Sequence, residues 1–250
     1  MSLLAKQEAT RGFPWNALIL GGIGMAILLS LGTWQLQRLA WKEGLIASID
    51  QRIHSAPRPL VEIEREFAET RDVDYWPVEV AGTLDHARER HFFATYEGQS
   101  GFYVYTPLRL ADGRFVLINR GFVPYDRKDA STRPQGQVEG TVTVTGLARN
   151  PLSEKPSFLI PENEPEKNIF YWKDRDTMAR SAGLDTAGLL PFFIDAGKAP
   201  NPGGLPVGGV TIIDLPNNHL QYAITWYGLA AALAGVLGVW LWRRRSEARA

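Results

Sequence analysis

The sequence contains no cysteine, and its charges cancel, with 27 Lys and Arg against 27 Asp and Glu. The missing cysteine excludes disulfides, thiolate metal sites, iron–sulfur clusters and cysteine nucleophiles. The balanced charge lacks the basic excess of a nucleic-acid-binding surface, so no nucleic acid is expected as a partner. Catalytic signatures are also missing, because no nucleophile elbow, zinc-protease motif, P-loop or dinucleotide fingerprint occurs. We therefore expect that the protein is not an enzyme.

What the chain does have is a long uncharged segment near each end. No charged side chain occurs over residues 12–37 or over 220–242. Each segment is long enough for a helix that crosses a hydrocarbon core of roughly 30 Å, which needs about 20 residues. The first could instead be a signal peptide, but its apolar stretch is too long and no cleavage site of small residues follows it. The sequence predicts two retained transmembrane helices, over 13–36 and 219–242.

The flanking charges predict the orientation of both helices. The three arginines at 243–245 directly follow the second segment, and Lys6 and Arg11 precede the first. The positive-inside rule then places both termini in the cytoplasm. Arg38 and Lys42, just beyond the first segment, favour the opposite orientation. They carry less weight because a long domain is translocated largely regardless of its charge.

The predicted organisation is a cytoplasmic tail over 1–12, the first helix, a periplasmic β-rich domain over 37–218, the second helix, and a basic cytoplasmic tail over 243–250. A mitochondrial protein of this plan would need a presequence rich in Arg and Ser. Twelve residues before the first helix leave no room for one. We therefore expect a multi-pass protein of a bacterial inner membrane, with its central domain outside the cytoplasm.

The central domain is predicted to be mainly antiparallel β, barrel-like or sandwich-like, within an α+β fold class. Helical spacing continues from the first membrane helix to residue 53, and IEREFAET (63–70) is a second short helix candidate. From Tyr75 onward the period shifts towards two. Strands are predicted over 77–84, 90–94, 101–108, 114–123, 137–147, 191–195 and 209–214. A hairpin turn is expected at 111–113, a helix over 172–182, and loops over 150–167 and 197–209.

Four histidines are the only ready nitrogen ligands for a metal or a haem. His54 is interpreted as a solvated surface residue beside a proline-rich loop. His86 and His91 are interpreted as part of a turn and a strand start, because paired ligands on one strand favour a spacing of two. Arg120 is interpreted as a charge at a strand end that is paired locally.

His219 differs from the other three because it lies where the second membrane helix begins. Polar side chains surround it in sequence: Asn217, Asn218, Gln221 and Thr225. Polar groups that enter lipid need partners, and imidazole is a common axial ligand of haem iron. On a helix, His219, Tyr222 and Trp226 share one face. The alternative is an interfacial belt, in which such residues lie at the headgroup level. The residues alone leave both interpretations open.

Four segments carry a family resemblance. They are LGTWQLQRLAWKEGLI (31–46), GFYVYTPLRLADGRFVLINRGFVP (101–124), the VEGTVTVTGLARNP region (138–151) and PNNHLQYAITWYGLA (216–230). Together they resemble the surfeit locus protein 1 (Surf/Shy) family of cytochrome c oxidase assembly factors. The likeness covers essentially the whole chain in the right order. One departure is Phe122, where many members have Trp in NRGWVP.

The resemblance implies an assembly factor for a haem-copper oxidase of the cytochrome c type. Such a protein binds haem a transiently and assists its insertion into subunit I, after haem A synthase has made it. Subunit I of cytochrome c oxidase, haem A synthase and the lipid bilayer are the implied partners, and a homo-oligomer is left open. The alternative is a membrane scaffold that stabilises an assembly intermediate and never holds haem. Catalytic haem modification is not favoured, because no second histidine or acid–base group accompanies His219.

The resemblance also implies the site. The histidine of the NNHL motif, here His219, is the expected axial ligand of the haem iron. The other expected cofactor-binding residues are its neighbours Tyr222, Thr225 and Trp226, and the facing motif Trp34, Gln35 and Arg38. Arg38 is expected to meet a haem propionate as a charge-assisted pair. The two helices are expected to pair through small residues, which permit close approach: Gly21, Gly24, Ala26, Gly32, Ala230, Ala231, Ala234, Gly235 and Gly238.

Overall fold

The computed structural model describes residues 15–211, 213 and 215–247, and the chain divides into two units. A helical unit combines the two ends of the chain, up to Ala47 and from Asp214. A β-rich unit covers Ser48–Ile213. The predicted tail over 1–12, with Lys6 and Arg11, and the last three residues of the predicted basic tail lie outside the described residues.

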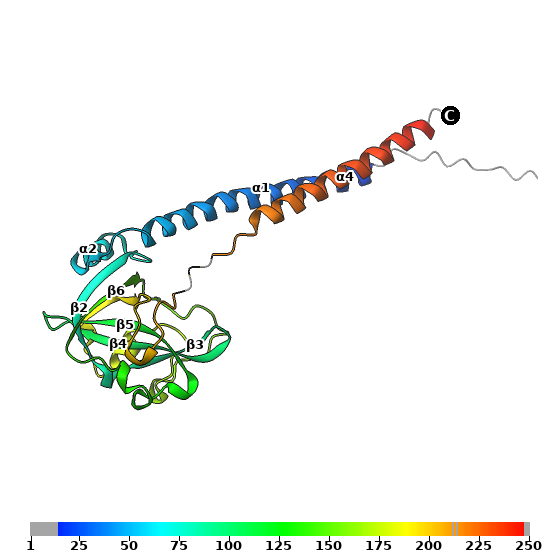
Figure 1. The fold of residues 1–250 in the computed structure, drawn as a ribbon. Helices are drawn as coiled ribbons and strands as arrows, with labels where there is room; N and C mark the ends of the chain where they lie inside the picture. The colour runs from blue at the N-terminus through cyan, green and yellow to red at the C-terminus, as the bar shows by residue number, and fades with distance from the viewer. Residues whose placement is uncertain (1–14, 212, 214, 248–250) are drawn as a thin grey trace, which may run out of the picture. The chain divides into compact units, whose positions relative to one another are not determined.

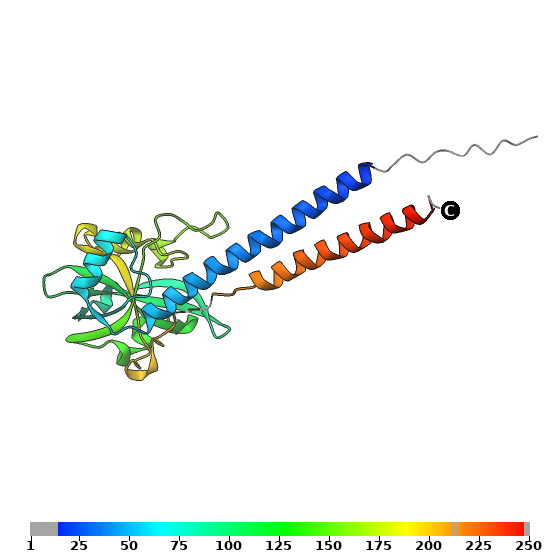
Figure 2. The ribbon, with the colours of Figure 1, turned by 90° about the horizontal axis from the view of Figure 1, so that it is seen from above.

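Both predicted membrane helices are present, and each is long and apolar enough to cross a bilayer. Helix α1 covers Trp15–Ile53 and α4 covers His219–Glu247 (Figures 1 and 2). Helix α1 runs without a break through the predicted end of the span at residue 36, as the continued helical spacing indicates. The two helices flank the β-rich unit in sequence, as the predicted fold class requires.

Helices α1 and α4 lie antiparallel, and glycines of α1 receive large side chains of α4. A methyl group added at Gly21 would lie 2.7 Å from Leu237, and one added at Gly32 would lie 2.9 Å from the ring of Tyr227. Ala230 of α4 is also buried. The prediction that small residues of both helices meet is therefore wrong in part. The expected members that are exposed instead are Ala26, Ala231, Ala234, Gly235 and Gly238.

The β-rich unit is built on a seven-stranded mixed sheet in the order β1-β2-β6-β7-β5-β4-β3. The strands are β1 (Arg58–Pro59), β2 (Pro77–Leu84), β3 (Arg90–Tyr96), β4 (Gln99–Arg109), β5 (Phe115–Pro124), β6 (Thr141–Arg149) and β7 (Leu189–Ala196). An additional pairing of β2 with β4 closes β2, β6, β7, β5 and β4 into a barrel. Most pairs are antiparallel, as predicted, but β5 and β7 are parallel.

Strand β5 is the most deeply buried strand of the barrel, because it is paired on both sides and covered on both faces. Val116 and Ile118 belong to one apolar cluster, while Leu117 belongs to another. This is the alternation of faces that a period of two dictates. Helix α2 (Leu60–Thr70) packs Ile63 and Phe67 into the first cluster, and α3 (Arg175–Ser181) packs residues into the second.

Two strand predictions are wrong. Residues 137–140 precede β6, because a 3₁₀ turn over Pro134–Gly136 leads into a further turn at Gly140, whose φ is +80°. Within 209–214, the described residues form no strand. Their neighbour Val207 makes only an isolated bridge to Phe122, and Thr211 bonds a side chain, Asp195, rather than a strand. Every strand of the closed barrel is already paired on both sides, so the barrel has no free edge for this segment to extend.

Gly121 allows that crossing segment to lie on β5, and its replacement tests the arrangement. Its φ is +121°, and an added methyl group would lie 1.9 Å from the carbonyl oxygen of Val207. Gly121→Ala should therefore lower the free energy of unfolding by more than about 2 kcal/mol. Chemical denaturation, monitored by near-UV circular dichroism, measures this change. Gly188→Ala, where nothing lies within 4 Å, is the matched control. Equal stability of the two variants would contradict the prediction.

Candidate functional site

The helix pair brings together two residues of the predicted site that are far apart in sequence. The imidazole Nδ1 of His219 lies 2.7 Å from the amide oxygen Oε1 of Gln35. His219 is the first residue of α4 and is partly buried, and Gln35 is buried on α1. In this arrangement Nδ1 carries the proton and donates a hydrogen bond to the amide oxygen, since a carbonyl oxygen can only accept one.

The second ring nitrogen of His219 is left available. Nε2 has no hydrogen-bond partner among the residues that the structure describes. With the proton on Nδ1, Nε2 is the nitrogen with the free lone pair. Histidines that bind metals usually donate their other ring N–H to a carbonyl or carboxylate, which fixes the tautomer and the ring orientation. The environment of His219 therefore fits the axial ligand of a haem iron, as the resemblance implies.

A second contact fixes the register of the two helices near this site. The hydroxyl groups of Thr33 and Tyr227 lie 3.0 Å apart, and the ring of Tyr227 lies against Gly32. Thr33 also donates to the carbonyl of Leu29 in its own helix. Neither Thr33 nor Tyr227 is among the site residues predicted from the sequence. A signal was present, because both are polar side chains within the apolar segments.

The other predicted site residues lie around the His219–Gln35 contact, but not in it. Trp34 and Tyr222 are 53% and 54% exposed on the helix pair, and Trp226 is partly buried. Thr225 donates to the carbonyl of Gln221 in its own helix, so its hydroxyl is satisfied locally. The exposed aromatic side chains offer an apolar surface beside the histidine.

Arg38 lies one turn beyond Gln35 on α1 and is exposed. Its guanidinium carbon lies 3.8 Å from the centre of the Trp41 ring, a cation–π contact. No hydrogen bond or ion pair from Arg38 to another described residue is formed, so its five N–H donors are available for an anionic group. Its expected pairing with a propionate remains a prediction.

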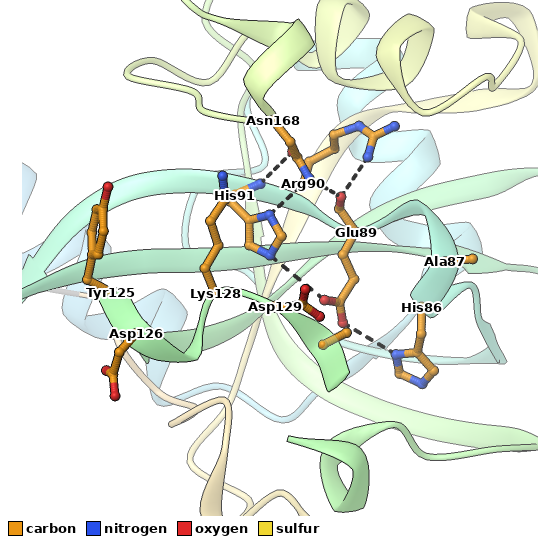
Figure 3. A pocket seen from close by; sticks show the side chains of 11 residues that line it. His86, Ala87, Glu89, Arg90, His91, Tyr125, Asp126, Lys128, Asp129 and Asn168 are labelled. Atoms are coloured by element: carbon orange, nitrogen blue, oxygen red, sulfur yellow. Dashed lines mark hydrogen bonds and ion pairs between the residues drawn. The ribbon is translucent and has the colours of Figure 1, made fainter. Parts of the chain in front are cut away.

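A second cluster of titratable groups lies in the β-rich unit, around the buried carboxylate of Glu89 (Figure 3). Arg133 donates to both carboxylate oxygens, and the guanidinium of Arg120 lies 3.5 Å from Oε1. Figure 3 shows His86 on one side of this carboxylate and His91 on the other. Their nearest ring nitrogens lie 3.5 and 3.9 Å from it.

The protonation states in this cluster follow from burial and charge. Burial alone would raise the pKa of Glu89, but its contacts with His86 and Arg133 outweigh burial and lower that pKa to about 2. Burial lowers the pKa of His91 to about 4. Asn168 donates its amide N–H to Nδ1 of His91, so the proton of the neutral ring lies on Nε2. Glu89 is thus charged and His91 is neutral at neutral pH.

This cluster is interpreted as a structural ion network, because Arg120 and Arg133 compensate the charge of Glu89 and also donate to backbone carbonyls and to Asn201. Among the described residues, no group of three or more His, Cys, Asp or Glu side chains could hold a metal ion.

His86 and His91 do lie at a 3₁₀ turn and a strand start, as predicted. The prediction for Arg120 is wrong, since this residue is buried within β5 and its partner Glu89 is distant in sequence. Spacing along the chain gives no signal for such a pair.

Removal of the central carboxylate should destabilise the β-rich unit. In Glu89→Gln, the buried guanidinium groups of Arg120 and Arg133 lose their counter-charge. Breaking a buried ion pair in this way costs roughly 3 kcal/mol or more. Denaturant unfolding of the full chain in detergent measures the loss. Glu79→Gln, the same substitution at an exposed strand position, should change stability by less than about 0.5 kcal/mol. Similar unfolding midpoints for both variants would contradict the structural interpretation.

His91 should make the β-rich unit less stable in acid. Its pKa is 6.5 when unperturbed and about 4 in the folded protein. Between these values the unfolded state binds more protons, so stability falls as pH falls, by on the order of 3 kcal/mol in total. His91→Gln should flatten this part of the profile, whereas His54→Gln, at an exposed position, should not. Denaturation midpoints at pH 7 and pH 4.5 measure both. A profile unchanged by His91→Gln would be inconsistent with a buried neutral ring.

Comparison with known proteins identifies similar chains. The model of the SURF1 family matches residues 23–231. Surfeit locus protein 1 of Rattus norvegicus is 39% identical over 258 residues, which cover 96% of this chain and 78% of the rat protein. Surfeit locus protein 1 of Homo sapiens is 41% identical over 220 residues, covering 81% and 70%. The SURF1-like protein of Monosiga brevicollis is 37% identical over 257 residues, covering 98% and 92%.

Proposed function

Because the chain belongs to the SURF1 family, we propose that it is an assembly factor for cytochrome c oxidase that binds haem a at His219 and assists its insertion into subunit I. The observation that carries the haem proposal is the state of the His219 ring. One nitrogen is bonded to Gln35 at 2.7 Å, and the other is without a hydrogen-bond partner among the described residues. This arrangement supports the proposal, because metal-ligating histidines commonly donate their other ring N–H to an oxygen acceptor.

The residues around His219 have distinct roles in this proposal. His219 supplies Nε2 as the axial ligand. Trp34, Tyr222 and Trp226 contribute aromatic surface for a large, mostly apolar ring system, and Thr225 lies on the same turn as Trp226. Arg38 meets a propionate with its free N–H donors, since charge-assisted pairs are the stronger hydrogen bonds. A haem held in this way supplies the redox-active iron that the client oxidase needs.

The proposed location follows from the two apolar helices and the charges beside them. Three consecutive arginines, Arg243, Arg244 and Arg245, lie near the end of α4. The positive-inside rule favours a cytoplasmic position for them. The β-rich unit then lies outside the cytoplasm, and the proposed membrane is a bacterial inner membrane. Subunit I and haem A synthase are the proposed protein partners, as the acceptor and the source of haem a. The chain acts by holding and transferring haem and has no catalytic step of its own.

A scaffold that stabilises an assembly intermediate without holding haem is the second candidate function. The absorption spectrum distinguishes the two functions, since only a haem-binding protein is coloured after purification.

The test is the purification of the full chain from cells that make haem a. We expect a haem absorption spectrum for the wild type and its loss in His219→Ala, because the variant lacks the axial ligand. His54→Ala is the matched control, since His54 is exposed at the end of α1 and should leave the spectrum unchanged. A colourless wild type would favour the scaffold. A coloured His219→Ala protein with the same spectrum would place the ligand elsewhere.

A further inference from the structure

The amide of Gln35 is placed on α1 where it contacts the ring of His219 rather than an open surface. Gln35 is 9% exposed, whereas its neighbours Trp34, Leu36, Gln37 and Arg38 are all exposed. A residue buried between two helices does not offer its side chain to a large ligand. The resemblance placed Gln35 among the cofactor-binding residues, and the geometry gives it another task.

We propose that Gln35 is a positioning residue that acts through His219. Its amide oxygen accepts a hydrogen bond from Nδ1–H, which keeps the proton on Nδ1 and leaves the lone pair of Nε2 available for the haem iron. This inference rests on the proposed function, and it names the group that sets the protonation and direction of the ligand. A neutral imidazole can carry its proton on either nitrogen, and only the Nδ1–H form leaves Nε2 free to bind a metal. The hydrogen bond at 2.7 Å selects that form.

Neighbouring contacts fix the position of Gln35 relative to His219. The Thr33–Tyr227 hydroxyl pair and the packing of Gly32 on Tyr227 fix the register of α1 against α4 within one turn of Gln35. Ala223, one turn after His219 on α4, is also buried. The ligand is therefore aligned only when the two ends of the chain have paired as helices.

Two substitutions separate positioning from simple packing. Gln35→Leu removes the acceptor while it keeps a side chain of similar size, so the His219 tautomer is no longer selected. Gln35→Glu supplies a charged acceptor, which raises the basicity of the ring through the same bond. Gln37→Leu is the matched control, because Gln37 is exposed on the same helix two residues away.

The first measurement needs no haem. The full chain, labelled with ¹⁵N-histidine and purified from cells that cannot make haem a, is compared with its variants by nitrogen NMR. The signals of His219 are identified by their loss in His219→Ala. We expect the Nδ1–H form in the wild type and in Gln37→Leu, and a shift towards the Nε2–H form in Gln35→Leu. The same tautomer in the wild type and Gln35→Leu would overturn the proposal.

The second measurement uses the protein loaded with haem a. The affinity for haem a should fall about 10- to 100-fold in Gln35→Leu, as for other residues that orient a metal ligand, and stay unchanged in Gln37→Leu. The iron–histidine stretching frequency in resonance Raman spectra should rise in Gln35→Glu, because a more basic ring binds iron more strongly. A role in packing alone would leave this frequency unchanged. Should Gln35→Leu fail to fold, Gln35→Glu still tests the proposal through this frequency.

The outcomes of the two proposals are distinguishable. A wild type that binds no haem a defeats the proposed function, while the NMR result still shows whether Gln35 sets the tautomer. A wild type that binds haem a through His219 supports the proposed function. If Gln35→Leu then keeps full affinity and Gln35→Glu leaves the iron–histidine frequency unchanged, the positioning role is overturned and the haem site stands.

Discussion

The constraint on which the helical unit depends is that a polar side chain in an apolar helix pair must find a polar partner. His219 and Gln35 satisfy one another, and Thr33 and Tyr227 do the same. Such hydrogen bonds contribute only about 1 kcal/mol each within membranes, so they do not by themselves hold the helices together. The close packing of Gly21 and Gly32 against large side chains of α4 supplies that association. The polar contacts instead select one register and one direction for the imidazole.

The β-rich unit solves the same problem in a different way. Its barrel closes through the β2–β4 and parallel β5–β7 pairings, which satisfy the backbone of the central strands. The charge of Glu89 is buried, and the two guanidinium groups of Arg120 and Arg133 compensate it. A buried ion pair adds little net stability compared with an apolar core, but it is costly to break. The network therefore matters most when one partner is removed, because the remaining charge is then buried without compensation.

The proposed function requires a site that binds its cofactor transiently. A single imidazole with a neutral hydrogen-bond acceptor can ligate iron, and in the proposed function the exposed side chains Trp34 and Tyr222 would leave a bound haem accessible to a receiving protein. The absence of cysteine removes a competing soft ligand and any covalent thioether link to a haem. In the proposed function, a site on the exposed face of two apolar helices suits an apolar cofactor that is passed from one membrane protein to another.

The two apolar helices, the β-rich domain between them and the family could be predicted from the sequence, because charge-free length, period-two alternation and the NNHL and NRG segments are local properties of the chain. The density of polar residues around His219 also distinguished it from the other histidines, but those residues left a ligand and an interfacial belt equally open, and the haem role is implied only by the family resemblance. Three contacts could not be predicted from the sequence: Gln35 with His219, the glycines of α1 with large side chains of α4, and Arg120 with Glu89. Each of these contacts joins segments distant in sequence, and the pairing register that brings such segments together is fixed by packing of the whole fold rather than by the residues near any one position.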